Sequence, residues 1–281
     1  MVKLIVDSVA DLDASLAEKE EIGIVPLTVS LKGVDYDDRT GIGLLDIYKA
    51  MTEEGEFPKT AAPSPKRFYD AFVKELDAGN SVICITVSSG LSGTYQNACL
   101  AANELSQKGR VDVIDSKAAG ITIGIVAILA ARAAREGLDH DTVLAMAQER
   151  TKKMHTYVML DTLDFLVMGG RISGLVAKAA SLLNIKPIIA FNDAGELYVR
   201  HKPMGFKKGL KWLYQTTVEK GVDFTNTILG YAYGDTPLLV DQLHGMLEKS
   251  IKIKETITTQ IGCVIGAYTG VSGVGIFFEE A

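Results

Sequence analysis

The sequence contains little cysteine, histidine or tryptophan, with three, four and one of these residues among 281. The cysteines, Cys84, Cys99 and Cys263, are odd in number and lack the spacing of a zinc site or a redox motif. We therefore expect free thiols, no bound metal and no cofactor. Free thiols within apolar patterns are typical of a reducing compartment, which favours a cytoplasmic protein.

The chain also lacks an excess of positive charge and a long apolar run. Its net charge of -6 argues against nucleic acid as a partner. The most apolar segment, 118–131, ends at Arg132 and falls short of the roughly 20 residues that cross a bilayer, so we predict a buried helix there. The start of the chain reaches Asp7 too soon for a secretory signal. No membrane span is expected, while a transient contact with a membrane surface stays open.

Apolar runs and helical patterns alternate through the first half of the chain. The runs with strand character are 3–6, 24–30, 81–87 and 111–115. Each is followed by a polar turn, and helical periodicity then recurs up to residue 153. This alternation is typical of a parallel sheet with helices on its faces.

The pattern changes after residue 155. A strand at 156–160 and a β-hairpin over 185–200 are followed by helices at 206–218 and 238–248 and by further strands. We predict an α/β fold with two domains: a parallel α/β domain over 1–155 and an α+β domain with a mainly antiparallel sheet over 156–281.

The turn Ser88-Ser89-Gly90-Leu91-Ser92-Gly93-Thr94-Tyr95-Gln96 lies between an apolar strand and a helical pattern. Unpaired N–H groups at a helix start favour an anion such as a carboxylate. Ser92 and Thr94 would add hydroxyl donors, and the glycines allow close backbone approach. The alternative is that Ser89 or Ser92 only caps the helix, and the local pattern does not decide between the two.

Two further motifs also have both a structural and a ligand interpretation. Asp7-Ser8 ends the first strand, where it would either face a binding crevice or cap the next turn. The segment 261–275 contains five glycines, which indicates close approach of its backbone either to a neighbouring helix or to a ligand.

A series of short motifs occurs in a fixed order along the chain. They are Val6-Asp7-Ser8 with Ala10-Asp11-Leu12, Lys59-Thr60 before Pro63-Ser64-Pro65, the turn 88–96, Gly169-Gly170-Arg171-Ile172, Ile185-Lys186-Pro187 and Ile265-Gly266-Ala267-Tyr268-Thr269-Gly270. Together they resemble the DegV family of bacterial fatty-acid-binding proteins.

The resemblance implies a carrier without catalytic residues, which holds one long-chain fatty acid in a tunnel between two domains. Such a carrier presents the acyl carboxylate to a separate fatty acid kinase for phospholipid synthesis. By motif position, Thr60 and Ser92 would hydrogen-bond the carboxylate, and Gly93 would offer its backbone N–H. Arg171 would face the kinase.

Two departures from the family pattern affect the expected site. Tyr268 stands where the family usually has His, and Thr60-Ala61-Ala62-Pro63 replaces Thr-Ser-Gln-Pro. A tyrosine hydroxyl donates to a carboxylate but does not become cationic near neutral pH. The resemblance therefore implies a carboxylate site that includes Tyr268 and relies on neutral donors.

Two alternatives to a fatty-acid carrier stay open. One, which follows from these departures, is a protein of the same fold that binds a different lipid or acidic small molecule. The other is a serine acyl hydrolase with Ser92 as nucleophile and the Gly93 amide as oxyanion donor. The histidines are His140, His155, His201 and His244. All lie outside the site motifs, so the hydrolase would lack an activating base.

Overall fold

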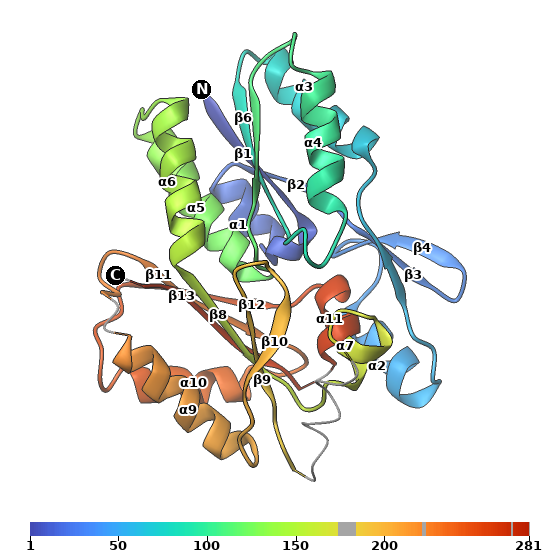
Figure 1. Cartoon of the computed structure of the whole chain (residues 1–281), viewed down its shortest axis with the longest axis vertical. Coiled ribbons are helices and arrows are strands. Elements are labelled where there is room, and N and C mark those ends of the chain that lie inside the picture. The colour runs from blue at the N-terminus through green and yellow to red at the C-terminus, as the bar shows by residue number, and fades with distance from the viewer. Residues whose placement is uncertain (174–183, 221–222, 271, 281) are drawn as a thin grey trace.

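The computed structural model describes residues 1–173, 184–220, 223–270 and 272–280. Two sheets lie one above the other along the long axis of the molecule (Figure 1). The upper sheet is parallel throughout, in the order β2 (Ile22–Val25), β1 (Val2–Asp7), β6 (Ser81–Thr86) and β7 (Val111–Asp115). The predicted parallel sheet is confirmed.

Helices cover both faces of the upper sheet. On its outer face, α3 (Pro65–Asp77) and α4 (Thr94–Glu104) bury a cluster that includes Phe68 and Phe72 against Val82 and Cys84. The other helices of this half are α1 (Ala14–Lys19), α5 (Ile121–Arg135) and α6 (His140–Lys153). All three cysteines of the chain are free.

The lower sheet has six strands and is mainly antiparallel, as predicted. Its order is β10 (Leu197–His201), β9 (Ile188–Phe191), β8 (Met154–Met159), β13 (Val274–Glu279), β11 (Ile228–Tyr233) and β12 (Glu255–Gln260). The one parallel pair is β11 with β12, while the other neighbouring pairs are antiparallel. Helices α9 (Phe206–Glu219) and α10 (Leu238–Leu247) cover the lower face.

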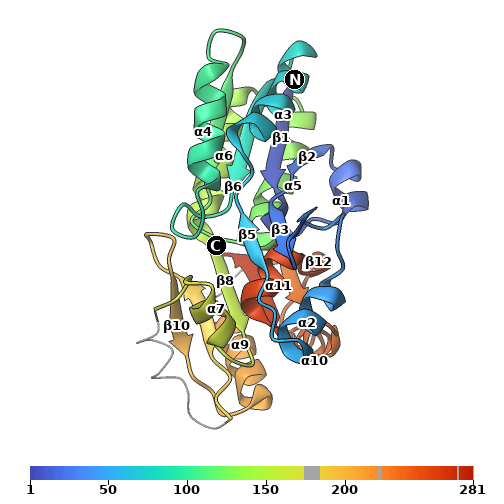
Figure 2. The same ribbon diagram turned by 90° about the vertical axis from the view of Figure 1, so that its right-hand side faces the viewer.

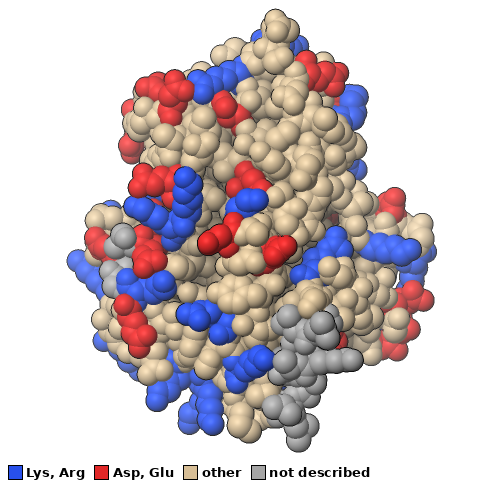
Figure 3. Space-filling view, in the orientation of Figure 1, with Lys and Arg blue, Asp and Glu red and all other residues tan. Residues whose placement is uncertain are grey.

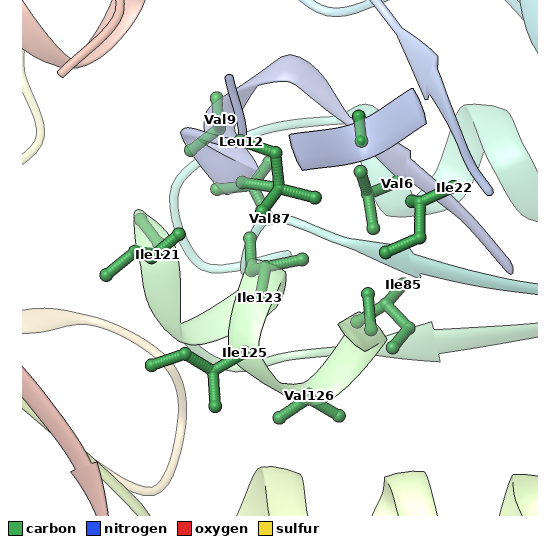
Figure 4. Close-up of a cluster of buried hydrophobic side chains, with 14 of the residues drawn as sticks. Val6, Val9, Leu12, Ile22, Ile85, Val87, Ile121, Ile123, Ile125 and Val126 are labelled. Carbon is green, nitrogen blue, oxygen red and sulfur yellow. The ribbon is translucent and has the colours of Figure 1, made fainter. Parts of the chain in front are cut away.

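Helix α5 is buried between the two sheets. One face packs on β1 and β6, and Figure 4 shows Ile123 on that side, beside Val87. The opposite face meets the lower sheet at Gly230, where an added Cβ would lie 2.7 Å from the Ile125 side chain. A helix that is apolar around its whole circumference must be covered on all sides. Residues of α5 and of both sheets therefore form one hydrophobic cluster.

Residues 24–61 differ from the prediction of a single strand followed by a turn. The expected strand 24–30 divides at Pro26 into β2 and β3 (Thr28–Leu31), because proline lacks the N–H that would continue the ladder. β3 pairs with β4 (Val34–Asp37) and β5 (Lys59–Ala61) in a small antiparallel sheet. Figure 1 shows β3 and β4 projecting at the side of the molecule.

The glycine-rich end of the chain contains two elements that the sequence pattern did not predict. Helix α11 (Cys263–Thr269) packs on α2 (Leu44–Glu53), where Gly266 lets Leu44 approach: an added Cβ would lie 2.3 Å from Leu44 Cδ1. The strand β13 then inserts between β8 and β11. Figure 2 shows β5, α2 and α11 side by side.

Asp7 is fully buried at the carboxyl end of β1. Its Oδ1 accepts from the Val9 N–H at 2.9 Å and its Oδ2 from the Val87 N–H at 2.7 Å. The neighbouring Ser8 Oγ accepts from the Leu27 N–H. The bond from Val9 is the cap that one interpretation predicted for Asp7, whereas the bonds from Val87 and Leu27 join the turn to distant segments. Burial raises the pKa of the Asp7 carboxyl to about 7, although the two N–H groups lower it.

We expect Asp7 to make stability fall as pH rises toward neutrality. In the unfolded chain the carboxyl ionises near its ordinary pKa of 3.8, whereas in the folded chain it keeps its proton to about pH 7. Its contribution is therefore full below pH 4 and is lost as pH rises through 7, at up to about 1.4 kcal/mol per pH unit. Urea unfolding of wild type and Asp7→Asn across this range measures the difference.

Subtracting the unfolding free energy of Asp7→Asn from that of wild type cancels the contributions of other titrating groups. Burial lowers the pKa of His140, His155 and His201, which opposes the trend near pH 6, but both proteins contain these histidines. An unfolding free energy of wild type that keeps a constant offset from Asp7→Asn over the whole range would contradict the shifted pKa.

Candidate functional site

The 88–96 turn lies between β6, which ends at Thr86, and α4, which begins at Thr94. The Ser92 hydroxyl lies 2.8 Å from Thr94 Oγ1 and accepts weakly from the Thr94 N–H at 3.3 Å. The Ser89 hydroxyl instead accepts from Lys117 Nζ at 3.0 Å. The helix has Gly93 at its N-cap, without a side-chain cap. Neither serine therefore occupies the N-cap position.

The tip of the β9–β10 hairpin packs against Ser88 and Gly90 of this turn. Ser88 Oγ donates to the Gly195 carbonyl at 2.7 Å, and an added Cβ on Gly90 would lie 2.7 Å from that oxygen. Gly90 therefore permits the close approach of the hairpin tip. The Ser88 hydroxyl thus bonds the turn to the second half of the chain, whereas the Ser92 side chain lies on the side of the turn that lines a cavity.

Helix α11 is held at its start by two buried aspartates. Asp11 Oδ1 accepts from the Gly262 N–H at 2.8 Å, and Asp38 Oδ1 accepts from the Val264 N–H at 3.2 Å. Burial raises the pKa of both carboxyls, that of Asp11 to about 7, while Arg39 Nη1, 3.0 Å from Asp11 Oδ1, lowers it. Carboxylates at a helix start are favoured by its unpaired N–H groups. The two residues thereby fix the direction of α11.

Tyr268, near the end of α11, lies at the centre of a polar cluster. Its hydroxyl is 2.5 Å from Thr60 Oγ1 on β5, and the Arg171 guanidinium lies over its ring with Cζ 5.0 Å from the centroid. Arg171 also donates to the carbonyls of Leu91 and Gly169, at 3.3 and 2.6 Å. The ring leaves no room for a side chain at Gly169, where an added Cβ would lie 2.2 Å away.

Two adjoining cavities meet at this cluster. The smaller, about 60 Å³, is lined by Thr60, Ser92, Arg171 and Tyr268 with apolar neighbours, and we call it the seat. The larger, about 90 Å³, is lined almost wholly by apolar side chains, and we call it the apolar chamber. Five residues line both: Leu91, Ala119, Arg171, Ile265 and Tyr268. The seat and the apolar chamber therefore adjoin, with these five residues in the wall that they share.

The walls of the apolar chamber come from both halves of the chain. Ala119 and Gly120 at the start of α5 face residues of the lower sheet, among them Val158, Ile189 and Phe277. Gly273 and Gly275 also line it, while Gly262 and Gly266 lie against Asp38 and Leu44. The close approach to a helix is thus found at Gly266, while approach to a ligand stays a prediction for Gly273 and Gly275.

The predicted site residues are brought together to different degrees. Thr60, Ser92 and Tyr268, which are far apart in the sequence, line one cavity. Gly93 is exposed at the start of α4 and is not among the residues that line the seat or the chamber. Arg171 is half-buried in the wall between them, so a positive charge lies beside donors expected to be neutral.

Each histidine has contacts away from Ser92. His140 joins Ser81 and Asp112 at the opposite end of β6, and His155 bonds Glu280. His201 stacks on Trp212, and His244 contacts Tyr231 and Glu248. None of the four histidines is therefore placed to act as the base that a hydrolase at Ser92 requires.

Several residues that shape the site were not among the predicted site residues. Asp11 and Asp38 hold the start of α11, and Asp11 adopts a left-handed φ of +51° before α1 begins at Ala14. Phe57 packs edge-on against Tyr268 at 6.4 Å. A short 3₁₀ turn at Ser8–Ala10 separates Asp11 from the end of β1, so no pattern at a strand end marked it, and nothing local marked Phe57.

Comparison with known proteins identifies the family. The model of the DegV family matches residues 1–281. The chain belongs to the DegV family. A DegV domain-containing protein of Caldanaerobacter subterraneus is 33% identical over 279 residues, which cover 99% of each chain.

Solved structures of DegV proteins share this fold. A fatty-acid-binding DegV family protein from Thermus thermophilus has a TM-score of 0.91 at 29% identity, covering 100% of this chain and 99% of that one. A stearic acid-binding protein from Eubacterium ventriosum has a TM-score of 0.87 at 26% identity and covers 100% and 98%. The predicted α/β architecture is thus shared with proteins that bind long-chain fatty acids.

The surface and the described residues give little sign of other classes of site. Figure 3 shows acidic and basic side chains interspersed over the upper half of one face, with basic ones more frequent near the lower edge. Within the described part of the chain, no group of three His, Cys, Asp or Glu side chains is placed to hold a metal ion. No described helix has the length and hydrophobicity needed to span a bilayer.

Proposed function

We propose that this DegV protein binds one long-chain fatty acid, with its carboxylate in the seat and its acyl chain in the apolar chamber. The observation that carries the proposal is that a polar cavity and an apolar cavity adjoin and share five lining residues. Long-chain acids have this same division into one polar end and a long apolar body. The related proteins described as fatty-acid-binding support the same ligand class.

The two cavities would contribute to affinity in different ways. Burial of each CH₂ group contributes about 0.8 kcal/mol, so a long chain gains most of its affinity from the apolar chamber. In the seat, hydroxyls of Ser92, Thr60 and Tyr268 would hydrogen-bond the carboxylate, and the Arg171 guanidinium would offset its charge. Hydrogen bonds to a charged group are roughly twice as strong as neutral ones.

The domain division 1–155 and 156–281 belongs to the same proposal. The chain passes from α6 directly into β8 at residue 154, and the apolar chamber has walls from both sides of that point. A ligand tunnel between two domains accounts for this arrangement. The fold also accommodates the alternative of a different lipid, since Tyr268, one of the two departures from the family pattern, lines both the seat and the apolar chamber.

We further propose that the bound acid is presented to a separate fatty acid kinase and that the protein itself is a carrier rather than an enzyme. Arg171 lies in the wall of the seat and would approach the kinase together with the carboxylate. Among the described residues the Ser92 hydroxyl is bonded to Thr94 and none of the four histidines contacts it, which supports a carrier.

The amount of fatty acid that is extracted from the purified protein tests whether the apolar chamber holds the acyl chain. Wild type should release a long-chain acid on denaturing solvent extraction, and Ala119→Phe should release little, because Ala119 lines both cavities. Mass spectrometry of the extract identifies the acid. Extraction of another lipid class from wild type would favour the alternative ligand, and an empty protein that also fails to bind added oleate would overturn the proposal.

Ala118→Phe is the matched control for that substitution. Ala118 and Ala119 are 7% and 8% exposed, but Ala118 lines an outer groove rather than the seat or the chamber. The control variant should retain its fatty acid. If both variants lose the acid together with thermal stability, general disruption would explain the loss.

Ser92→Ala tests the seat. We expect its affinity for a fluorescent fatty acid to fall by about tenfold or more, because a hydrogen bond to a charged group contributes about 1.5–3 kcal/mol. Ser89→Ala, in the same turn but bonded to Lys117, should bind as wild type does. Equal affinity of all three proteins would place the carboxylate elsewhere.

Arg171→Ala tests presentation to the kinase. With a bacterial fatty acid kinase and ATP, acyl phosphate formation at saturating loaded carrier should fall several-fold. Arg200→Ala, in the outer groove, serves as the control. If the loss of rate disappears once the carrier is fully loaded, Arg171 acts in fatty acid binding alone.

A further inference from the structure

A carboxyl oxygen of Asp11, in the wall of the apolar chamber, has no hydrogen-bond partner among the described residues. Asp11 lines the chamber, and its side chain is only 1% exposed. Its Oδ1 is occupied by the Gly262 N–H and Arg39 Nη1, whereas Oδ2 has no hydrogen-bond partner within the described residues. A buried acceptor without a partner costs about 1–3 kcal/mol, more for a charged group, so this oxygen requires an explanation.

The space beside Oδ2 is kept open by a glycine. An added Cβ on Gly120 would lie 3.8 Å from Asp11 Oδ2 and 3.4 Å from the Phe277 ring, and both Gly120 and Phe277 line the chamber. Oδ1 is directed to α11 and Arg39. Oδ2 is therefore the carboxyl oxygen that lies on the side of Gly120, and it has no partner among the described residues.

Helix α11 gives the distance between this oxygen and the seat. Asp11 bonds Gly262 at the start of the helix, and Tyr268 lies six residues further along. At the helical rise per residue this separation is about 9 Å. A long acyl chain with its carboxylate at Tyr268 would thus pass Asp11 in its middle part, well before its methyl end.

We propose that the apolar chamber prefers an acyl chain that carries a hydroxyl group in its middle, which donates its hydrogen to Asp11 Oδ2. This proposal rests on the proposed fatty acid function and narrows its substrate class to hydroxy fatty acids. An ionised carboxylate accepts hydrogen bonds only, so a hydroxyl suits it. A ketone at the same position would place one acceptor against another.

The charged and polar groups around Asp11 favour a neutral ligand group over a cation as the hydrogen-bond donor to Oδ2. Arg39 already supplies a positive charge at Oδ1, and the neighbouring groups on other elements are the Asp38 carboxyl and the Tyr48 hydroxyl. A hydroxyl brings a hydrogen-bond donor into the apolar chamber without a second charge, which would be costly to bury there.

Binding of three matched acids tests the proposal: octadecanoic, 10-hydroxyoctadecanoic and 10-oxooctadecanoic acid. The measurement is made at pH 8.5, where Asp11 is ionised, since burial raises its pKa only to about 7. We expect the hydroxy acid to bind about tenfold tighter than octadecanoic acid and the oxo acid to bind more weakly than either. 18-Hydroxyoctadecanoic acid, with its hydroxyl at the far end, should show no gain.

Asp11→Asn provides the discriminating variant. Its amide would keep an oxygen for Gly262 and would present N–H to the chamber, so binding of the oxo acid should rise relative to wild type. Arg39→Lys controls for disturbance of Oδ1, and it should retain the wild-type order of the three acids. Circular dichroism and thermal unfolding establish that both variants fold.

The outcomes separate this proposal from the one on which it rests. Failure of wild type to bind any of the acids would overturn the fatty acid function itself. Binding of octadecanoic and 10-hydroxyoctadecanoic acid with equal affinity would keep that function and overturn the preference, leaving water as the partner of Oδ2. An unchanged order of the acids in Asp11→Asn would also overturn it.

Discussion

The burial of α5 on two sides is the constraint on which the arrangement of the molecule depends. A helix lined by isoleucine, valine and alanine around its circumference is stable in water only when both of its faces are covered. The parallel sheet covers one face and the antiparallel sheet covers the other, with Gly230 permitting the second contact. The start of α5 is consequently held at the junction of the two sheets, and the apolar chamber forms there, beside Ala119 and Gly120.

The seat depends on a second device, the anchoring of α11. This helix has only seven residues. Its orientation is fixed by hydrogen bonds from its first turn to the carboxyl groups of Asp11 and Asp38. Its end then carries Tyr268 to Thr60, and the ring supports Arg171. Contacts near residues 11 and 38 therefore decide whether residues 60 and 268 meet, although all four are distant in sequence.

The sequence predicted those parts of the fold that depend on local periodicity. The alternation of strands and helices gave the parallel sheet, and the apolar pattern around 118–131 gave the buried helix, because each element has a hydrophobic period of its own. It failed at β13 and α11, where glycines obscure the period, and at β4 and β5, which are short. For the site, family motifs indicated Thr60, Ser92, Tyr268 and Arg171 together. The position of Arg171 over the Tyr268 ring could not be predicted, since it depends on the packing of Gly169.

The replacement of histidine by Tyr268 is best understood together with that packing. A histidine that becomes cationic would supply its own charge to a carboxylate, whereas tyrosine supplies only a hydroxyl. In this chain the Arg171 guanidinium lies on the tyrosine ring, where a cation is attracted to the π face, so the charge and the hydroxyl come from two residues. Arginine remains protonated throughout the pH range in which histidine titrates. A seat built in this way would hold an anion with little dependence on pH near neutrality, and any such dependence would then arise from the buried aspartates behind it.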